Sequence, residues 1–153
     1  MMIRSLDPAT DAAACDTIVA GLPDWFGDPR GIADCAVAVR TRAGLVSAEP
    51  GAVTGFLTFE RRSRSVWELT WMAVRHDRRG AGGGTALVER LASDLAPACT
   101  LLVVKTLSDR VDPGPAYAAT RAFYLARGFR PMAELDIWGP DDPCQLLGRR
   151  LGT

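Results

Sequence analysis

A run of glycines stands at the start of a predicted helix, directly after two arginines. The stretch Arg75–Leu91 reads RHDRRGAGGGTALVERL, with glycine at positions 80, 82, 83 and 84. The first N–H groups of a helix have no partner within the helix, and the helix dipole favours negative charge there. Glycine tolerates a positive φ and close approach of a ligand, and arginine adds charge-assisted bonds to phosphate. The stretch therefore predicts a binding site for a phosphate-bearing ligand, with a merely flexible turn as the alternative.

The spacing of these glycines excludes two common nucleotide-binding loops. A dinucleotide-binding fingerprint needs G-x-G-x-x-G, but Thr85 and Leu87 stand where the third glycine of each register should be. A P-loop needs a lysine after its second glycine, and the stretch contains no lysine. The pattern that fits is the acyl-CoA pattern R-x-x-G-x-G/A, formed by Arg79, Gly82 and Gly84.

Three segments together resemble a bacterial branch of the GNAT superfamily of N-acetyltransferases. RGAGGGTAL resembles the family's CoA loop, ELTWMAV the strand before it, and FYLARGF (Phe123–Phe129) its later FY-x-x-x-GF motif. The resemblance implies acetyl-CoA as co-substrate, with its pyrophosphate on the loop amides and its pantetheine arm paired with the strand. The implied donor-binding residues are Met72, Ala73, Val74, Arg79, Gly80, Ala81, Gly82, Gly83, Gly84 and Thr85. One departure is Tyr117, which replaces an Asn that many members carry seven residues before the motif's tyrosine.

Acetyl transfer to an amine needs a base that deprotonates the ammonium and an acid that protonates the departing thiolate. The resemblance implies that the Tyr124 hydroxyl approaches the CoA sulfur, and that Glu68 holds the position of a catalytic glutamate found in several members. Neighbouring helical residues point about 100° apart, so Phe123 and Tyr124 cannot both face one core. We expect Tyr124 to be the acid and Glu68, or a water relay, to provide the base. A core tyrosine and an exposed strand carboxylate are the structural alternatives.

Aromatic residues are the candidates for the acceptor side, because aromatic side chains supply much of the contact area in small-ligand sites. They predict a pocket for an apolar or aromatic amine, although each could simply pack in the core or a loop. Lys105 is expected at an exposed strand end, and His76 in solvent. The predicted acceptor residues are Trp25, Phe26, Trp71 and Trp138.

The periodicity of apolar residues predicts the elements that carry these side chains. The first half of the chain is predicted to contain a strand over 2–6, a helix over 9–22 capped by Thr10 or Asp11, and a weaker helix over 30–36. A β-rich segment follows over 36–75, with its best strands at Val53–Glu60 and Val66–Val74. The second half is predicted to contain an amphipathic helix from Thr85 ended by Pro97, a buried strand over 100–107, a helix over 114–129, and two strands within 130–151. This order predicts a three-layer α/β fold, with a mixed, mostly antiparallel central sheet flanked by helices, which is also the GNAT fold.

Length and composition indicate a single domain over residues 1–153. Eighteen basic and 18 acidic residues cancel, so no overall field favours nucleic acid or a membrane as partner. The four cysteines form no C-x-x-C pair and there is one histidine, so we expect no metal site. Free thiols and the absence of a long apolar stretch at the start favour a cytoplasmic protein, and a homodimer is possible.

These observations favour an acetyl-CoA-dependent N-acetyltransferase whose acceptor is a primary amine of a small molecule or peptide. The alternative is a non-catalytic acyl-CoA-binding sensor or interaction module that keeps the loop but not the chemistry. A binder of another nucleotide or phosphoanion is a third, weaker reading. The glycine stretch bears on the donor and carries no information on the acceptor.

Overall fold

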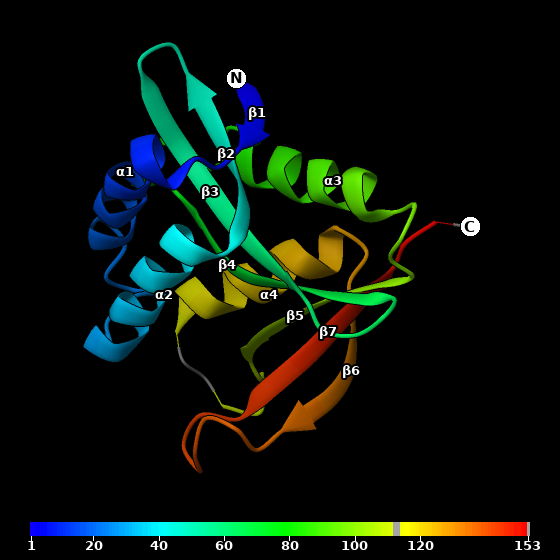
Figure 1. The fold of residues 1–153 in the computed structure, drawn as a ribbon. Helices are drawn as coiled ribbons and strands as arrows, with labels where there is room; N and C mark the ends of the chain where they lie inside the picture. The colour runs from blue at the N-terminus through cyan, green and yellow to red at the C-terminus, as the bar shows by residue number, and fades with distance from the viewer. Residues whose placement is uncertain (112–113, 153) are drawn as a thin grey trace. The chain divides into compact units, whose positions relative to one another are not determined.

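Seven segments of the chain form the strands of one sheet, in the order β1-β2-β3-β4-β5-β7-β6 (Figure 1). The structure is a computed structural model that describes residues 1–111 and 114–152. The pairings β1/β2, β2/β3, β5/β7 and β6/β7 are antiparallel, which confirms the predicted α/β fold with a mostly antiparallel sheet. The elements are β1 (Met2–Ser5), α1 (Pro8–Ala20), α2 (Pro29–Thr41), β2 (Ala43–Glu49), β3 (Ala52–Arg61), β4 (Val66–Val74), the 3-10 turn η1 (His76–Arg78), α3 (Gly83–Leu95), β5 (Leu101–Leu107), α4 (Pro115–Ala126), β6 (Arg130–Leu135) and β7 (Cys144–Arg150).

The chain divides into two compact units, which are described separately. The first comprises Met1–Glu60 with Leu69–Asp94, and the second Arg61–Glu68 with Leu95–Thr153. In the first unit, α1 and α2 pack on one face of β2, β3 and β4. Val46, Phe56 and Ala73 bring strand side chains into that core cluster. The helices contribute Ala12, Cys15, Ile18, Val19, Cys35 and Val39.

Helix α3 packs on the opposite face of the same strands. Val46 and Phe56 point toward α1 and α2, so their neighbours Ser47 and Gly55 point the other way, because strand side chains alternate. A Cβ atom on Gly55 would lie 2.8 Å from Ser47 Oγ and 3.4 Å from Leu87 Cδ1 of α3. Glycine at position 55 therefore lets the apolar stripe of α3 approach the sheet backbone.

The start of α1 differs from the predicted cap. Asp7, and not Thr10 or Asp11, is the N-cap, and its side chain accepts a hydrogen bond from Ala9 N at 3.1 Å. Pro8 follows at the first helical position, where its missing N–H costs nothing. Asp11 is instead buried, and it accepts two hydrogen bonds from Arg4, at 2.7 and 3.0 Å. The pair between the Asp11 carboxylate and Arg4 of β1 thus stabilises the packing of α1 against the strand.

Helix α2 extends to Thr41, beyond the predicted 30–36, so the β-rich reading of residues 36–41 is wrong. The alternating letters AVAVR favour a strand, but the burial has helical spacing: Cys35, Ala38 and Val39 are buried while Val37 is 57% exposed. Asp28 caps the helix through a hydrogen bond from Arg30 N at 2.9 Å. Packing against α1 therefore overrides the local strand preference of the β-branched residues.

In the second unit, β5, β7 and β6 form an antiparallel group of strands. Helix α4 packs against β5, and the side chain of Arg121 donates a hydrogen bond to the carbonyl of Leu107 at 3.2 Å. Gly128 follows α4 with a φ of 91°, a conformation in which glycine commonly ends a helix. The buried apolar side chains here are Leu95, Cys99, Leu102, Val103, Val104, Tyr124, Phe129, Cys144, Leu147 and Leu151.

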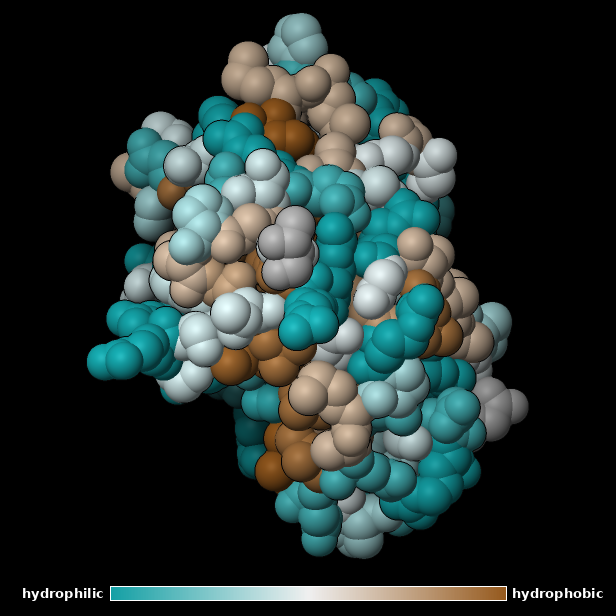
Figure 2. Space-filling model, turned by 90° about the vertical axis from the view of Figure 1, so that its right-hand side faces the viewer, coloured by the Kyte–Doolittle hydropathy of each residue, from teal (hydrophilic) through white to brown (hydrophobic). Residues whose placement is uncertain are grey.

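Exposed apolar side chains are dispersed over several elements. On the face drawn in Figure 2, hydrophobic side chains form separate patches among polar ones. Within the described residues, none of the helices combines the length and the apolar character that crossing a lipid bilayer requires. The large exposed apolar residues are Met1, Met2, Ile32, Val37, Leu125, Met132, Ile137 and Trp138.

The Arg4–Asp11 pair predicts an acid-sensitive contribution to stability. Hydrogen bonds from Arg4 lower the pKa of Asp11, so its contribution is present above the unfolded-state pKa and is lost as the pH falls. We expect Asp11→Asn to reduce the free energy of unfolding at neutral pH by about 1–3 kcal/mol. The difference from the wild type should shrink between about pH 5 and pH 3, measured by urea unfolding.

Asp16→Asn is the matched control for this prediction. Asp16 also pairs with an arginine, Arg40, at 2.6 Å, but both side chains are more than 40% exposed. An exposed pair of this kind contributes about 0–1 kcal/mol. Equal losses in the two variants, or an Asp11→Asn loss that does not change with pH, would contradict the assigned role of Asp11.

Candidate functional site

The glycine stretch forms the connection from β4 to α3 in the first unit. Gly80 and Gly82 have φ values of 78° and 91°, in a region that other residues rarely adopt. A Cβ atom at either position would meet nothing within 4 Å, so glycine is needed here for conformation and not for space. Helix α3 begins at Gly83, and the bond from Ala86 N to the Gly82 carbonyl is 3.0 Å long. The amides of Gly83 and Gly84 precede this bond, so they have no partner within the helix.

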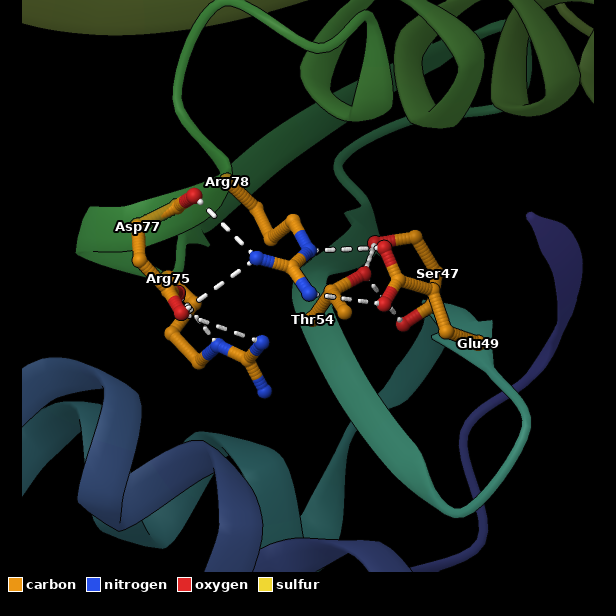
Figure 3. A network of polar contacts seen from close by, with 6 residues as sticks. All are labelled: Ser47, Glu49, Thr54, Arg75, Asp77 and Arg78. Atoms are coloured by element: carbon orange, nitrogen blue, oxygen red, sulfur yellow. Dashed lines mark hydrogen bonds and ion pairs between the residues drawn. The ribbon is translucent and has the colours of Figure 1, made fainter.

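Ion pairs hold the loop against the end of β2 (Figure 3). Arg78 donates from Nε and Nη2 to the two oxygens of Glu49, at 2.7 and 3.1 Å. Arg78 also contacts Asp77 at 3.3 Å, and Asp77 pairs with Arg75. The Arg78 guanidinium lowers the pKa of Glu49 below its usual range. Arg78, the first of the two arginines before the glycines, is therefore engaged with protein carboxylates, and Arg79 is the exposed arginine of the pair.

Buried hydroxyl groups support the base of the loop. Ser47 Oγ and Thr54 Oγ1 are 3.1 Å apart, and Thr54 Oγ1 also donates to the Ser47 carbonyl at 3.2 Å (Figure 3). A Cβ atom on Gly83 would lie 3.7 Å from Ser47 Oγ, so the first turn of α3 rests on this pair. The local sequence pattern does not point to these residues or to Glu49. The available signal was Gly55, because a glycine inside the predicted strand Val53–Glu60 often marks a site where another backbone approaches closely.

Three of the four predicted acceptor aromatics form one cluster with Arg79. The Arg79 guanidinium lies 4.2 Å from the centre of the Trp25 ring, within the range of a cation–π interaction. Phe26 and Trp71 stack with ring centres 6.1 Å apart. All three aromatic side chains are partly buried against the core of the first unit. Trp138 does not belong to this cluster: it lies after β6 in the second unit and is 42% exposed.

The predicted donor-binding strand is the last part of β4. Ala73 is buried against the core cluster, while Met72 and Val74 are half-buried. Arg75 N, directly after the strand, donates to the Thr54 carbonyl at 2.7 Å, which secures the strand end to β3. Side chains alternate along a strand, so Thr70 and Trp71 point to opposite faces of β4. Trp71 packs on the core, and the Thr70 hydroxyl lies 2.7 Å from that of Thr58.

Glu68 is a buried carboxylate of the second unit and is 6% exposed, unlike the exposed strand carboxylate that was its structural alternative. Arg62 Nε donates to Glu68 Oε1 at 2.9 Å, and Lys105 Nζ lies 3.3 Å from the same oxygen. Both contacts use Oε1. Lys105, expected at an exposed strand end, thus lies within β5 with 29% of its side chain exposed and a carboxylate as its partner.

Tyr124 lies in the last turns of α4 and is 5% exposed. Its ring makes edge contacts with Phe123 and Phe129, at 5.3 and 5.4 Å between ring centres. Burial raises the pKa of its phenol well above the usual value, so the hydroxyl keeps its proton at all physiological pH values. Among the described residues, the phenol oxygen has no hydrogen-bond partner. A protonated hydroxyl of this kind can act as a proton donor.

Groups suited to metal binding or nucleophilic catalysis are scarce. Within 1–111 and 114–152, no three His, Cys, Asp or Glu residues gather in a way that could hold a metal ion. The four cysteines are buried free thiols, and His76 is exposed in the basic turn, as expected. The chemistry of the described residues is therefore that of an anion-binding loop, an aromatic cluster, a buried carboxylate and a buried phenol.

Comparisons with known proteins agree with this set of residues. Residues 34–131 match the model of the acetyltransferase (GNAT) domain family. Among curated protein sequences, none matches the chain. A protein from Desulfovibrio desulfuricans assigned to the GNAT acetyltransferases has a similar structure, with a TM-score of 0.85, 20% identity and 99% of each chain covered.

Two further solved structures are similar over nearly the whole chain. An aminoglycoside 6'-N-acetyltransferase complexed with coenzyme A has a TM-score of 0.77 and 16% identity, with 100% of this chain and 98% of that chain covered. The ribosomal-protein-S18-alanine N-acetyltransferase of Escherichia coli has a TM-score of 0.78 and 20% identity, with 99% and 94% covered. At these identities the likeness concerns the fold.

The chain belongs to the GNAT acetyltransferase family, because the family model covers more than half of it and the fold is that of the family. It is therefore an acetyl-CoA-dependent acetyltransferase by class, and acetyl-CoA is its co-substrate. The loop fits such a ligand: two glycines with positive φ and the open amides of Gly83 and Gly84 form an anion-binding turn at a helix start.

The conformation of Gly82 gives a test of this fit. Gly82→Ala places a side chain at a φ of 91° and should distort the turn, so we expect the dissociation constant of acetyl-CoA to rise at least about tenfold, measured by calorimetry. Gly139→Ala is the matched control, since Gly139 has a φ of 97° and equal space around it but lies in the loop before β7. Both variants should lose similar stability. Equal affinity for acetyl-CoA in both would contradict the assignment of the loop.

The contact between Arg79 and Trp25 predicts an optical signal of donor binding. When donor phosphates attract Arg79, the Trp25 ring loses its cation, and its fluorescence should change. We expect Trp25→Phe to abolish the emission change that acetyl-CoA causes in the wild type. Trp138→Phe removes an exposed tryptophan of the other unit and should leave the change intact. An unaltered change in Trp25→Phe would show that the signal does not come from the contact between Arg79 and Trp25.

Proposed function

We propose that the protein is an N-acetyltransferase that moves the acetyl group of acetyl-CoA to a primary amine of a small molecule or peptide. The observation that carries the proposal is the anion-binding turn at the start of α3 in a chain of the GNAT family. In this proposal residues 1–153 act as one catalytic domain. A reducing, cytoplasmic setting is part of it, because free thiols persist in such compartments and all four cysteines are free.

The donor-binding part of the proposal uses the loop and the strand before it. Arg79 and the amides of residues 80–85 bind the pyrophosphate, where glycine conformation and helix dipole both favour an anion. The backbone of Met72, Ala73 and Val74 pairs with the pantetheine arm, a mode of binding that depends little on side-chain identity. Arg78 has a positioning role, since its bond to Glu49 fixes the turn.

The chemical step requires an uncharged amine and a protonated leaving group. Glu68, directly or through a water molecule, takes a proton from the acceptor ammonium. Its contacts with Arg62 and Lys105 both involve Oε1, which leaves Oε2 for this proton. The amine nitrogen forms a bond to the acetyl carbon, the carbon–sulfur bond breaks, and the Tyr124 hydroxyl gives its proton to the departing sulfur. The raised pKa of Tyr124 keeps that proton available.

The acceptor part of the proposal rests on the aromatic residues. Trp25, Phe26 and Trp71 offer stacking surfaces of the kind that bind apolar or aromatic groups of a small ligand, and exposed Trp138 adds a further one. The similar structures include enzymes named for an aminoglycoside and for a ribosomal protein, so the fold accommodates both small and peptide acceptors. A primary amine beside an apolar group is the class that the aromatic cluster supports.

A thiol-release assay with acetyl-CoA and a panel of primary amines tests the proposal. The panel contains aromatic monoamines, polyamines, aminoglycosides and peptides with a free N-terminus. Turnover with any of these supports an acetyltransferase, and a preference for aromatic amines supports the acceptor class. Tight binding of acetyl-CoA in calorimetry without turnover on any amine would instead favour the non-catalytic acyl-CoA-binding module.

Tyr124→Phe tests the proposed acid. Phenylalanine keeps the ring contacts with Phe123 and Phe129, so stability and acetyl-CoA affinity should change little. Loss of the proton donor should lower kcat by about 10²- to 10⁴-fold in steady-state assays. Because burial raises the pKa of Tyr124, the wild-type kcat should show no decline from its ionisation up to about pH 10.

Tyr117→Phe serves as the control on the same helix. Tyr117 is half-buried, and burial likewise raises its pKa, but it lies outside the FY-x-x-x-GF motif of Phe123–Phe129. We expect its kcat to remain within about twofold of the wild type. Turnover in Tyr124→Phe that equals that of Tyr117→Phe would remove Tyr124 from the mechanism and leave the rest of the proposal standing.

A further inference from the structure

A carboxylate of the second unit is paired through one oxygen and open at the other. Arg62 and Lys105 both contact Glu68 at Oε1, and among the described residues Oε2 has no partner. Within the same part of the chain, only Thr106 has a fully buried side-chain polar atom that lacks a partner. Glu68 Oε2 is therefore not fully buried, although the side chain as a whole is 7% exposed. A hydrogen-bond donor of a ligand can reach this oxygen.

Lys105 has unused hydrogen-bonding capacity beside this carboxylate. It is the only lysine of the chain. Its ammonium lies at ion-pair distance from Glu68, but among the described residues it donates no hydrogen bond. An ammonium carries three N–H donors, and the Lys105 side chain is 29% exposed. An anionic group from outside the protein can thus bind Lys105 without displacing Glu68.

The face of β5 that carries Lys105 is the more open of its two faces. Strand side chains alternate, so Lys105 shares its face with Leu107 and with Leu146, its partner on β7. All three are half-buried. The side chains on the opposite face are buried: Leu102, Val104 and Thr106. The Lys105 face therefore places partly accessible apolar side chains next to the charged pair.

The proposed reaction changes the charge that Lys105 faces. When Glu68 takes a proton from the acceptor ammonium, its carboxyl group becomes neutral. Lys105 then has no anionic partner among the described residues, because Glu68 is the one carboxylate at ion-pair distance. Losing that partner costs most where solvent is partly excluded. A carboxylate on the acceptor would keep Lys105 paired, so the site favours an acceptor that carries one close to its amine.

We propose that Glu68 and Lys105 together bind a free α-amino acid as the acetyl acceptor. Its ammonium donates to Glu68 Oε2 and loses a proton there, and its carboxylate accepts hydrogen bonds from Lys105 Nζ. An α-amino acid carries both groups on one carbon, which matches the adjacent carboxylate and ammonium of the site. An apolar side chain suits Leu107 and Leu146. The proposal rests on the proposed function and narrows its acceptor, since a peptide has no carboxylate beside its terminal amine.

Matched acceptors test the role of Lys105 in the thiol-release assay. L-Phenylalanine and phenethylamine form one pair, and L-leucine and isoamylamine a second; the members of each pair differ only in the carboxylate. We expect wild-type kcat/KM to be at least about tenfold higher for the amino acid in at least one pair. Lys105→Met should lower kcat/KM about tenfold more for that amino acid than for its amine, mainly through KM. Lys105→Arg should retain most of the preference.

Arg62→Met is the matched control, because Arg62 binds the same oxygen of Glu68 but has no assigned contact with the acceptor. Any change in Arg62→Met should affect the amino acid and the amine equally, since it acts through Glu68. If Lys105→Met also lowers both members of a pair equally, Lys105 only supports Glu68 or the fold, and the amino-acid site is overturned.

The single lysine also allows a measurement that does not depend on turnover. Protein made with isotopically labelled lysine should give one lysine Cε resonance, and the preferred amino acid should shift it further than the matched amine does. A resonance that the amino acid does not move would overturn the role of Lys105. Acetylation of amines without any preference for amino acids would overturn it while the proposed function stands. If the wild type acetylates no amine, the proposed function and the acceptor site fall together.

Discussion

The two-point ion pair between Arg78 and Glu49 fixes the connection from β4 to α3, and the anion-binding geometry depends on that connection. Gly80 and Gly82 give the chain the freedom to turn, but such freedom alone would leave the amides before α3 without a fixed direction. The guanidinium joins the turn to the end of β2 at 2.7 and 3.1 Å, and a planar fork of this kind fixes orientation as well as distance. The buried Ser47–Thr54 pair supports the first turn of the helix from below. The loop is thus organised by groups that make no contact with a phosphate themselves.

Arginine also links the donor loop to the segment between α1 and α2. Arg79 is the motif residue that is exposed, and in the free protein its guanidinium lies on the Trp25 ring. Trp25 and Phe26 lie in the connection between α1 and α2, and Phe26 stacks on Trp71 of β4. Residues assigned to the donor and residues assigned to the acceptor therefore share contacts within the first unit. This arrangement offers a direct physical route by which occupation of one site alters the other.

Local rules explain which parts of this structure could be predicted from the sequence. The strand Val66–Val74, the glycines with positive φ and the helix that follows depend on neighbouring residues, and each lies where the periodicity places it. Pairings between distant segments could not be predicted: Arg78 with Glu49, Glu68 with Lys105, and Arg4 with Asp11 each join elements far apart in the chain. The sequence favours Asp11 as a cap because a carboxylate near a helix start suits that role, and only packing against β1 assigns it elsewhere. For the same reason, the length of α2 depends on which of its side chains are buried and not on the strand preference of its β-branched residues.

The burial of the cysteines has a practical consequence for reagents that attack sulfur. Burial raises the pKa of Cys15 and of Cys35 to about 12, and it raises that of Cys144 as well. Since the thiolate is the reactive form, roughly one in 10⁴ of the Cys15 and Cys35 thiols is ionised near pH 8. The native protein should therefore react only slowly with thiol-specific dyes. The thiol of released CoA can then be measured over a low background. A single cysteine introduced by Arg64→Cys in the exposed turn before β4 would then carry a label by itself, without removal of the natural cysteines.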